Sequence, residues 1–208
     1  MIFIGLDLSI THSGYCVLDY DGVLIGSGVV QSKVTEFDNT IQRYRVTGNR
    51  LFQALGDVRG MDCRFMIEDY AYAADTNNIT SLAEFTGILV YRLVREKGVP
   101  FRHIRKCTPQ QLKMFATGLG NAKKDMVMKE VFKKWGFEGQ DDNEVDAFVL
   151  AQICRRIFLW KETGSTDSDG LMPGDHKLLN TKQKEAVKKI GNHEGFITSR
   201  AKNKKNKA

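Results

Sequence analysis

The chain lacks any long hydrophobic run, and it has few of the residues that cross-link or interrupt a fold. No stretch of about 18 apolar residues occurs, so we expect no transmembrane helix. Met1 opens directly into an apolar segment, which argues against a secretory signal peptide. Proline occurs three times, and the four cysteines lack the spacing of a zinc site or a disulfide framework. We therefore expect a soluble, cytoplasmic protein whose thiols are reduced.

The positive charge of the chain is concentrated in two segments. The formal net charge is +6, yet residues 181–208 alone carry nine Lys or Arg and only two acids. Residues 92–134 hold twelve Lys or Arg against three acids. Basic segments of this kind are typical of proteins that bind a polyanion such as nucleic acid, although a charged run is as often only a solvated face. The charge pattern alone therefore leaves nucleic-acid binding open.

Hydrophobic periodicity predicts a mixture of strands and helices. Three apolar segments joined by short turns, at residues 1–7, 14–19 and 23–30, predict an antiparallel meander. Two more strands are predicted at residues 64–68 and 101–104, and helical patterns lie at residues 40–55, 79–97, 109–116, 122–135 and 143–160. This order predicts an α/β fold, a mixed five-stranded sheet flanked by helices, in an arrangement that resembles the ribonuclease H-like fold.

The composition changes after residue 160. Residues 163–175 are rich in Gly, Ser, Thr and Asp and are typical of a linker, while a helical pattern covers residues 182–190. The final stretch, 200–208, is a low-complexity run of Lys and Asn. We therefore predict one folded domain over residues 1–160, followed by a linker, a short helix and a basic disordered tail over residues 161–208. Removal of the chain after about Asn180 is expected to weaken DNA binding.

Several carboxylates occupy positions where a solvated surface acid is not expected. Asp7 and Glu68 each end a short apolar run, and Asp146 precedes the apolar part of a helix. Carboxylates that converge in a buried place repel one another unless protons or divalent cations neutralise them, and Mg²⁺ prefers such oxygen ligands. The other interpretation is that these acids only cap strand ends and a helix start.

Four short segments in the first 160 residues carry a family resemblance. They are Ile4-Gly5-Leu6-Asp7-Leu8-Ser9 followed by Ser13-Gly14-Tyr15, then Met66-Ile67-Glu68, then Thr108-Pro109-Gln110-Gln111-Leu112-Lys113, and finally Asp142-Asn143-Glu144-Val145-Asp146-Ala147. In order and spacing they resemble the RuvC-type Holliday junction resolvases, especially the shorter members found in bacteriophages. That resemblance implies metal-binding roles for Asp7, Glu68 and Asp146.

The resemblance implies a Mg²⁺-dependent, structure-specific endodeoxyribonuclease that resolves four-way DNA junctions by paired nicks, in recombination, repair or phage DNA processing. It implies two Mg²⁺ ions per active site, with Mn²⁺ as an expected substitute. It also implies a homodimer that acts on branched DNA in the cytoplasm, either with the nucleoid or, for a phage protein, in the host. The apolar face of the helix at residues 79–95 is a candidate dimer interface, and core packing explains that face equally well.

One ligand position departs from the family pattern. Asn143 stands three residues before Asp146, where the family has Asp or His. Asp142 lies four residues before Asp146, on the same face of a helix, and could serve instead. We therefore predict that the catalytic and metal-binding residues are Asp7, Glu68, Asp142 and Asp146, with Asn143 as the alternative fourth ligand.

Other polar residues nearby receive simpler interpretations. Asp141 and Glu144 are predicted to be surface acids, and Asp141 or Asp142 would cap the helix that follows. His12 and His103 are predicted to be structural or surface residues.

The expected DNA contacts rest on the same resemblance. Lys113 and Lys124 correspond to two DNA-contacting lysines of the family, and Lys123 adjoins the second of them. Tyr70 or Tyr72, in the segment after Glu68, could stack on a base at the junction, an interaction that contributes roughly 1 to 3 kcal/mol. The alternative for both tyrosines is packing beneath their own loop.

Three other functions fit parts of the pattern. The chain could be a broader branched-DNA or flap endonuclease, or a non-catalytic nucleic-acid-binding module if Asn143 occupies a ligand position. Residues 5–14 also resemble the first phosphate loop of actin-like ATPases and sugar kinases. Those proteins need a second such domain and a second glycine-rich loop, and neither is apparent, so we expect no nucleotide cofactor.

Overall fold

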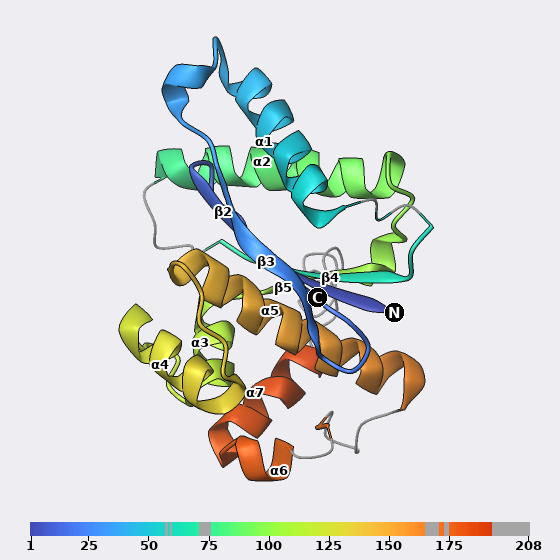
Figure 1. Ribbon diagram of the computed structural model, residues 1–208, viewed down its shortest axis with the longest axis vertical. Coiled ribbons are helices and arrows are strands. Elements are labelled where there is room, and N and C mark those ends of the chain that lie inside the picture. Colours follow the sequence, from blue (N-terminus) through green and yellow to red (C-terminus); the bar gives the residue numbers. More distant parts are fainter. Residues whose placement is uncertain (57, 59, 71–75, 165–170, 173–174, 193–208) are drawn as a thin grey trace, which may run out of the picture.

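A mixed five-stranded sheet lies between two layers of helices in the computed structural model (Figure 1). The structure describes residues 1–56, 58, 60–70, 76–164, 171–172 and 175–192. The strands are β1 (Ile2–Asp7), β2 (His12–Leu18), β3 (Leu24–Gln31), β4 (Cys63–Glu68) and β5 (Ile104–Cys107), and their order in the sheet is β3-β2-β1-β4-β5. The first three form the predicted antiparallel meander, while β4 runs parallel to β1, and β5 parallel to β4. The predicted α/β fold is confirmed.

The helices form one layer on each face of the sheet (Figure 1). The first layer contains α1 (Thr40–Leu55) and α2 (Thr76–Arg95), and the second contains α3 (Pro109–Thr117), α4 (Lys124–Trp135), α5 (Asp142–Phe158), α6 (Asp175–Leu178) and α7 (Thr181–Asn192). Three short turns complete the described elements: η1 (Val34–Glu36), η2 (Phe101–His103) and η3 (Leu159–Thr163). Each layer encloses its own hydrophobic core against the sheet.

Alternation along β1 decides which way its last residue faces. Ile4 and Leu6 belong to the core beneath α1 and α2, whereas Phe3 belongs to the core beneath α5. Because side chains alternate between the faces of a strand, Gly5 and Asp7 face α5 together with Phe3. The same rule places Glu68 on the α5 side of β4, since Met66 packs in that core.

Two glycines bring α5 directly onto the sheet. A Cβ atom on Gly5 would lie 2.0 Å from the carbonyl oxygen of Ala147, and one on Gly14 would lie 2.1 Å from that of Asn143. No side chain fits in either place, so the backbone of α5 rests on the backbones of β1 and β2. The first turn of α5 therefore lies beside Asp7, the residue that pairs with Gly14 in the sheet.

Capping residues fix both ends of α3 and the start of α5. Thr108 and Gln111 form a capping box at the start of α3, with Pro109 at its first position, and Gly118 ends the helix in the left-handed conformation. At the start of α5 the Asp141 carboxylate accepts a hydrogen bond from the backbone N–H of Glu144. The sequence left Asp141 and Asp142 as alternative caps, and the structure shows that Asp141 is the N-cap of α5.

The fifth strand lies three residues later than predicted. Residues Phe101–His103 form a 3₁₀ turn in which the backbone N–H of His103 donates to the carbonyl of Pro100. The strand begins at Ile104, which pairs with Phe65 of β4. The sequence pattern did not indicate a strand at Arg105 and Lys106 because both are polar. An edge strand such as β5 needs few apolar residues.

The apolar face of α2 faces the core. Phe85, Leu89 and Leu93 are fully buried in the core between the first helix layer and the sheet, and Thr86 is buried beside them. Of the two interpretations of this face, core packing accounts for these residues, and the homodimer stays a prediction. Within the described residues, no helix is both long and apolar enough to cross a membrane.

The chain beyond residue 160 contains more structure than its composition predicts. The predicted short helix exists as α7, and α6 begins within the segment that was predicted to be a linker. Val187 and Ile190 of α7 are buried in the same core as α5. The predicted basic tail, 200–208, lies outside the described residues.

Candidate metal and nucleic-acid site

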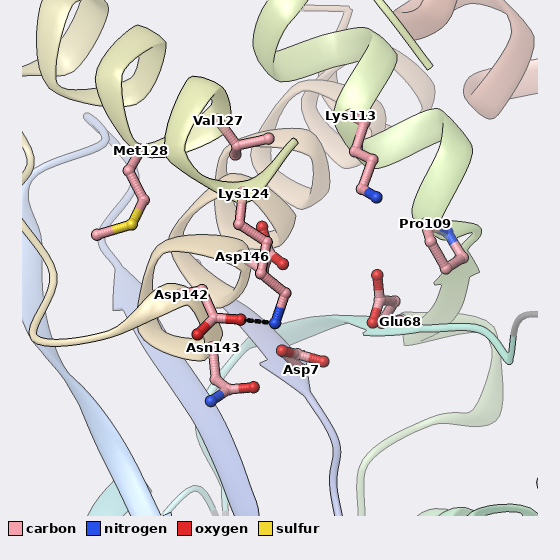
Figure 2. A pocket seen from close by; sticks show the side chains of 10 residues that line it. All are labelled: Asp7, Glu68, Pro109, Lys113, Lys124, Val127, Met128, Asp142, Asn143 and Asp146. Carbon is pink, nitrogen blue, oxygen red and sulfur yellow. Dashed lines mark hydrogen bonds and ion pairs between the residues drawn. The ribbon is translucent and has the colours of Figure 1, made fainter. Parts of the chain in front are cut away.

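One pocket of about 260 Å³ gathers most of the predicted site residues (Figure 2). Its walls come from the ends of β1 and β4 and from the first turns of α4 and α5, with α3 on the remaining side. It is lined by Asp7, Glu68, Pro109, Lys113, Lys124, Val127, Met128, Asp142, Asn143 and Asp146. All four predicted acids, both predicted family lysines and the alternative ligand Asn143 thus lie around a single cavity.

Asp7 and Glu68 are neighbouring carboxyl groups on adjacent strands. Burial is the main cause of a raised pKa for both groups, and the charge of Asp7 raises the pKa of Glu68 further. The raised pKa of Glu68 favours its protonated form beside the charge of Asp7. A cation that displaced the proton from Glu68 would leave both carboxylates negatively charged.

Asp146 contributes a third carboxylate from the second turn of α5. Burial raises the pKa of Asp146 to about 7, with further contributions from the negative charges of Asp7 and Asp142. A cation that binds beside such a carboxyl group stabilises its charged form. The three acids on β1, β4 and α5 therefore form a place where positive charge is favoured.

Lys124 supplies positive charge to this place. Its ammonium group forms an ion pair with the Asp142 carboxylate, and Figure 2 shows it pointing among Asp142, Asp146 and Asp7. The same ammonium group lowers the pKa of Asp7 and of Asp146 against the effect of burial. Asn143 also lines the pocket, but its side-chain amide donates to the carboxylate of Asp141.

The donor set fits a hard divalent cation. The pocket offers carboxylate oxygens and the amide of Asn143, with no thiol or imidazole among its lining residues, and its one sulfur is the thioether of Met128. In the part of the chain that the structure describes, no three His, Cys or acidic side chains are close enough to hold one ion together. In Figure 2 the Asp142 carboxylate is directed at Lys124 and not at Glu68.

Comparison with known proteins places this site in a family context. No family model matches the chain. The chain is 28% identical over 162 residues to the crossover junction endodeoxyribonuclease RuvC of Sulfurovum sp. (strain NBC37-1), covering 74% of this chain and 96% of that protein. The enzyme of the same name from Synechococcus sp. (strain CC9605) is 26% identical over 161 residues, which are 73% of this chain and 96% of the relative.

Solved structures agree with these relatives. Thermus thermophilus RuvC superposes with a TM-score of 0.59 at 20% identity, over 77% of this chain and 96% of that one. A T. thermophilus RuvC in complex with a Holliday junction substrate gives the same TM-score at 18% identity, over 78% and 96% of the two chains. The chain is a distant homologue of the RuvC-type Holliday junction resolvases. Its fold is that of RuvC, a ribonuclease H-like sheet with helices on both faces.

The lysines predicted from the RuvC resemblance differ in their surroundings. Lys113, on α3, points into the pocket on the side of Glu68 and lowers the pKa of that carboxyl group (Figure 2). Lys124 comes from a different helix and is the first residue of α4. Lys123 precedes α4, is exposed, and is not among the lining residues of the pocket. The predicted DNA-binding role of Lys123 remains a prediction.

Of the two tyrosines predicted to stack on DNA bases, the structure describes Tyr70. Tyr70 is half-buried, and the ammonium group of Lys106 lies 3.8 Å from the centre of its ring. Lys106 also donates to the carboxylate of Asp69, at 2.9 Å. Tyr70 is thus held beside the end of β4 by a cation–π contact. Tyr72 lies outside the described residues.

Sequence reasoning assigned Glu144 wrongly and missed one wall of the pocket. Glu144, predicted to be a surface acid, is 5% exposed, and its carboxylate accepts hydrogen bonds from Ser27 on β3 and from the backbone N–H of Gln140. Its partner Ser27 is 117 residues away in sequence, so no local pattern could reveal it. Met128 lines the pocket one turn after Lys124, and that helical spacing could have predicted it.

Proposed function

We propose that this chain is a Mg²⁺-dependent endonuclease that resolves four-way DNA junctions by paired nicks. One observation carries the proposal: Asp7, Glu68, Asp142 and Asp146 share a pocket with Lys113 and Lys124. Homology to the RuvC enzymes supports the same function at the level of the family. The proposal assigns the four acids to metal binding and the two lysines to the DNA backbone.

The acids would hold the metal through their oxygens. Asp7 and Glu68 would bind from the sheet, and Asp142 and Asp146 from α5, once Asp142 leaves Lys124 and Glu68 loses its proton. Two Mg²⁺ ions bound there would lower the pKa of an attacking water and stabilise the departing 3′ oxygen. Mn²⁺ is expected to replace Mg²⁺ because it accepts the same ligands.

The lysines would act on the phosphate that is cut and on its neighbours. Lys113 points into the pocket on the side of Glu68, and Lys124 points among the other acids, so a DNA strand that crosses the pocket would meet positive charge at two places. The oxygen of water forms a bond to phosphorus, and the bond from phosphorus to the 3′ oxygen breaks, which leaves a 5′-phosphate and a 3′-hydroxyl. Positive charge beside the phosphate is favourable because negative charge accumulates there during this step.

Resolution of a junction requires two cuts, so the proposal includes a homodimer with one pocket in each subunit. Tyr70, beside the end of β4, and Tyr72 would meet the DNA bases next to the cut, where an aromatic ring can stack on an unpaired base. The competing function is a nuclease that cuts forks and flaps as readily as four-way junctions.

The deciding experiment is cleavage of labelled synthetic DNA. A four-way junction, a Y-fork, a flap and a linear duplex of related sequence are incubated with the full chain in Mg²⁺ and in EDTA. Symmetric, Mg²⁺-dependent nicks confined to the junction are expected. Equal cutting of forks and flaps would replace the proposal with a general branch nuclease, and binding without cutting would indicate a non-catalytic module.

A further inference from the structure

The last turn of α3 is closed by a side chain from α7. Gln183, which is 1% exposed, donates from its side-chain amide to the carbonyl oxygens of Phe115 and Ala116, at 2.8 and 2.9 Å. Carbonyls in the last turn of a helix have no partner within that helix and must be satisfied from outside. Both donors of the Gln183 amide are therefore used on the end of α3.

The acceptor of the same side chain is also used. The Gln183 side-chain oxygen accepts from the backbone N–H of Asn180 at 2.9 Å, and the Asn180 side chain accepts from the backbone N–H of Gln183 at 3.1 Å. This reciprocal pair is a capping box at the start of α7. A Cβ atom on Gly118, the C-cap of α3, would lie only 2.8 Å from the Asn180 amide nitrogen. The start of α7 is thus pressed against the end of α3.

A buried ion pair attaches α6, the short helix before α7, to α5. Arg156 of α5 donates to both carboxylate oxygens of Asp175 on α6, at 2.8 and 2.6 Å, and both side chains are 3% exposed. The Arg156 guanidinium also lies 5.2 Å from the centre of the Phe115 ring on α3. A paired guanidinium and carboxylate in a buried place fix orientation well, because either group left alone would be very unfavourable.

Helix α3 needs such support because it is short. It has nine residues, and isolated helices shorter than about 12 to 15 residues are marginal in water. Its start is fixed by the capping box at Thr108, and its end by Gln183. Lys113 lies between these two fixed points, and it is the charged residue that α3 contributes to the pocket, beside Pro109.

We propose that Gln183 is a positioning residue that holds α3, and with it Lys113, against the carboxylates of the pocket. Residues 175–192 are then part of the nuclease domain and not an appendage to it. A cut after Asn180 would remove this anchor along with the basic tail. The inference rests on the proposed nuclease function for the role of Lys113, but the anchoring of α3 is testable without any activity.

The test uses two substitutions of Gln183 in the full chain. Gln183→Glu keeps an oxygen for the Asn180 N–H but turns an acceptor toward the carbonyls of α3. Gln183→Met keeps the length of the side chain and removes all its polar atoms, so one variant remains if the other does not fold. Thr181→Glu is the matched control, because it adds the same charge in the same turn at an exposed position.

Cleavage of a four-way junction is then measured under single-turnover conditions at saturating DNA, with and without Lys113→Ala. Each Gln183 variant should slow cleavage by about tenfold or more, since a misplacement of about 1 Å can cost on the order of 100-fold in rate. In the Lys113→Ala background the further loss should be below about twofold, because the two substitutions remove one effect. Equal losses in both backgrounds would overturn the proposal.

Hydrogen exchange gives a readout that does not depend on cleavage. Backbone amides of α3 should exchange faster in both Gln183 variants than in the Thr181→Glu control, while those of β4 keep their protection. Unchanged protection of α3 would overturn the anchoring role even in an active enzyme. If the wild-type chain does not cut DNA, the proposed function fails, and the exchange result alone still decides whether Gln183 anchors α3.

Discussion

The two ends of strand β4 hold buried charge in opposite ways. At its start, Arg64 is 5% exposed and forms ion pairs with Asp62 and Glu162, and its guanidinium also contacts a ring nitrogen of His103. The hydrogen bond from Arg64 lowers the pKa of Asp62. At its end, Glu68 meets another carboxyl group, Asp7, and the pKa of both is raised.

The difference separates a structural cluster from a functional one. Around Arg64 the positive and negative groups satisfy one another, so the cluster stabilises the fold and has no need of a ligand. Around Glu68 the acids outnumber the cations of the pocket, four against two, so folding leaves negative charge that a divalent ion can neutralise. The same strand thus contributes stability at one end and binding at the other.

The largest expected effect comes from removing one acid at the functional end. Asp7→Asn should lower Mg²⁺-dependent junction cleavage by more than the roughly 10- to 100-fold loss that follows removal of a metal's outer-shell partner. Junction affinity should change little, because the lysines remain. Asp62→Asn, at the opposite end of β4, is the control and should cut normally. Cleavage and electrophoretic binding assays in parallel would check both, and an active Asp7→Asn would refute the site.

The fourth ligand is decided by two neighbouring substitutions. Asp142→Ala should reduce cleavage by at least about tenfold, as expected for loss of a metal contact, and Asn143→Ala should leave it nearly unchanged. The reason is that Asp142 faces the pocket cation Lys124, whereas the amide of Asn143 is paired with Asp141. Cleavage rates across a Mg²⁺ titration measure the contrast. Loss of activity only in Asn143→Ala would reverse the assignment.

Stability should respond in the opposite sense from activity. Arg64→Met leaves Glu162 and Asp62 without their cation and should lower the free energy of unfolding by about 1 to 3 kcal/mol. Asp7→Asn removes a poorly compensated buried charge, so without metal it should unfold at the same free energy as the wild type or higher. Urea titrations in EDTA at neutral pH measure both. A strongly destabilised Asp7→Asn would mean that the two ends of β4 are alike.

The pH dependence of the metal-free protein follows from the same acids. Burial raises the pKa of Asp7 to about 6 and that of Asp146 to about 7, so the folded state binds more protons than the unfolded state above about pH 4. Stability contributed by these groups is therefore lost as pH rises toward 7. The melting temperature in EDTA should fall from pH 5 to pH 8, and it should fall less in Asp146→Asn. Identical pH profiles would contradict the raised pKa of Asp146.

The smallest expected effect concerns Lys124. Its ion pair with Asp142 must open before that carboxylate binds a metal, so Lys124→Met should bind Mn²⁺ about two- to fivefold more tightly in the absence of DNA, the range expected for an exposed ion pair. Lys123→Met removes the same charge from the adjacent exposed position and should bind Mn²⁺ as the wild type does. Electron paramagnetic resonance of free Mn²⁺ measures the affinities. Weaker binding in Lys124→Met would show that Lys124 supports the metal.

The elements of the site that lie within a few residues of one another could be predicted from the sequence. An apolar run that ends in an acid identified the ends of β1 and β4, and a threonine followed by proline identified the start of α3. The resemblance to the RuvC-type resolvases implied a shared metal site for Asp7, Glu68 and Asp146, and all three line one pocket.

What the sequence could not predict depends on partners far apart in the chain. The burial of Glu144 depends on Ser27, and the attachment of α7 depends on carbonyls in α3, 67 and 68 residues before Gln183. The late start of β5 depends on its pairing with β4, because Arg105 and Lys106 have no strand pattern of their own. Such contacts exist only once the chain is folded.

The glycines beneath α5 set how freely this site can change. Because Gly5 and Gly14 let main chain rest on main chain, the spacing of the acids is fixed by peptide groups, which are the same in every sequence. Side chains around the pocket can therefore be exchanged to alter specificity without moving the frame that carries them. A single methyl group added at either glycine would leave every charged side chain present. It would push α5, with Asp142 and Asp146, away from the strands that carry Asp7 and Glu68.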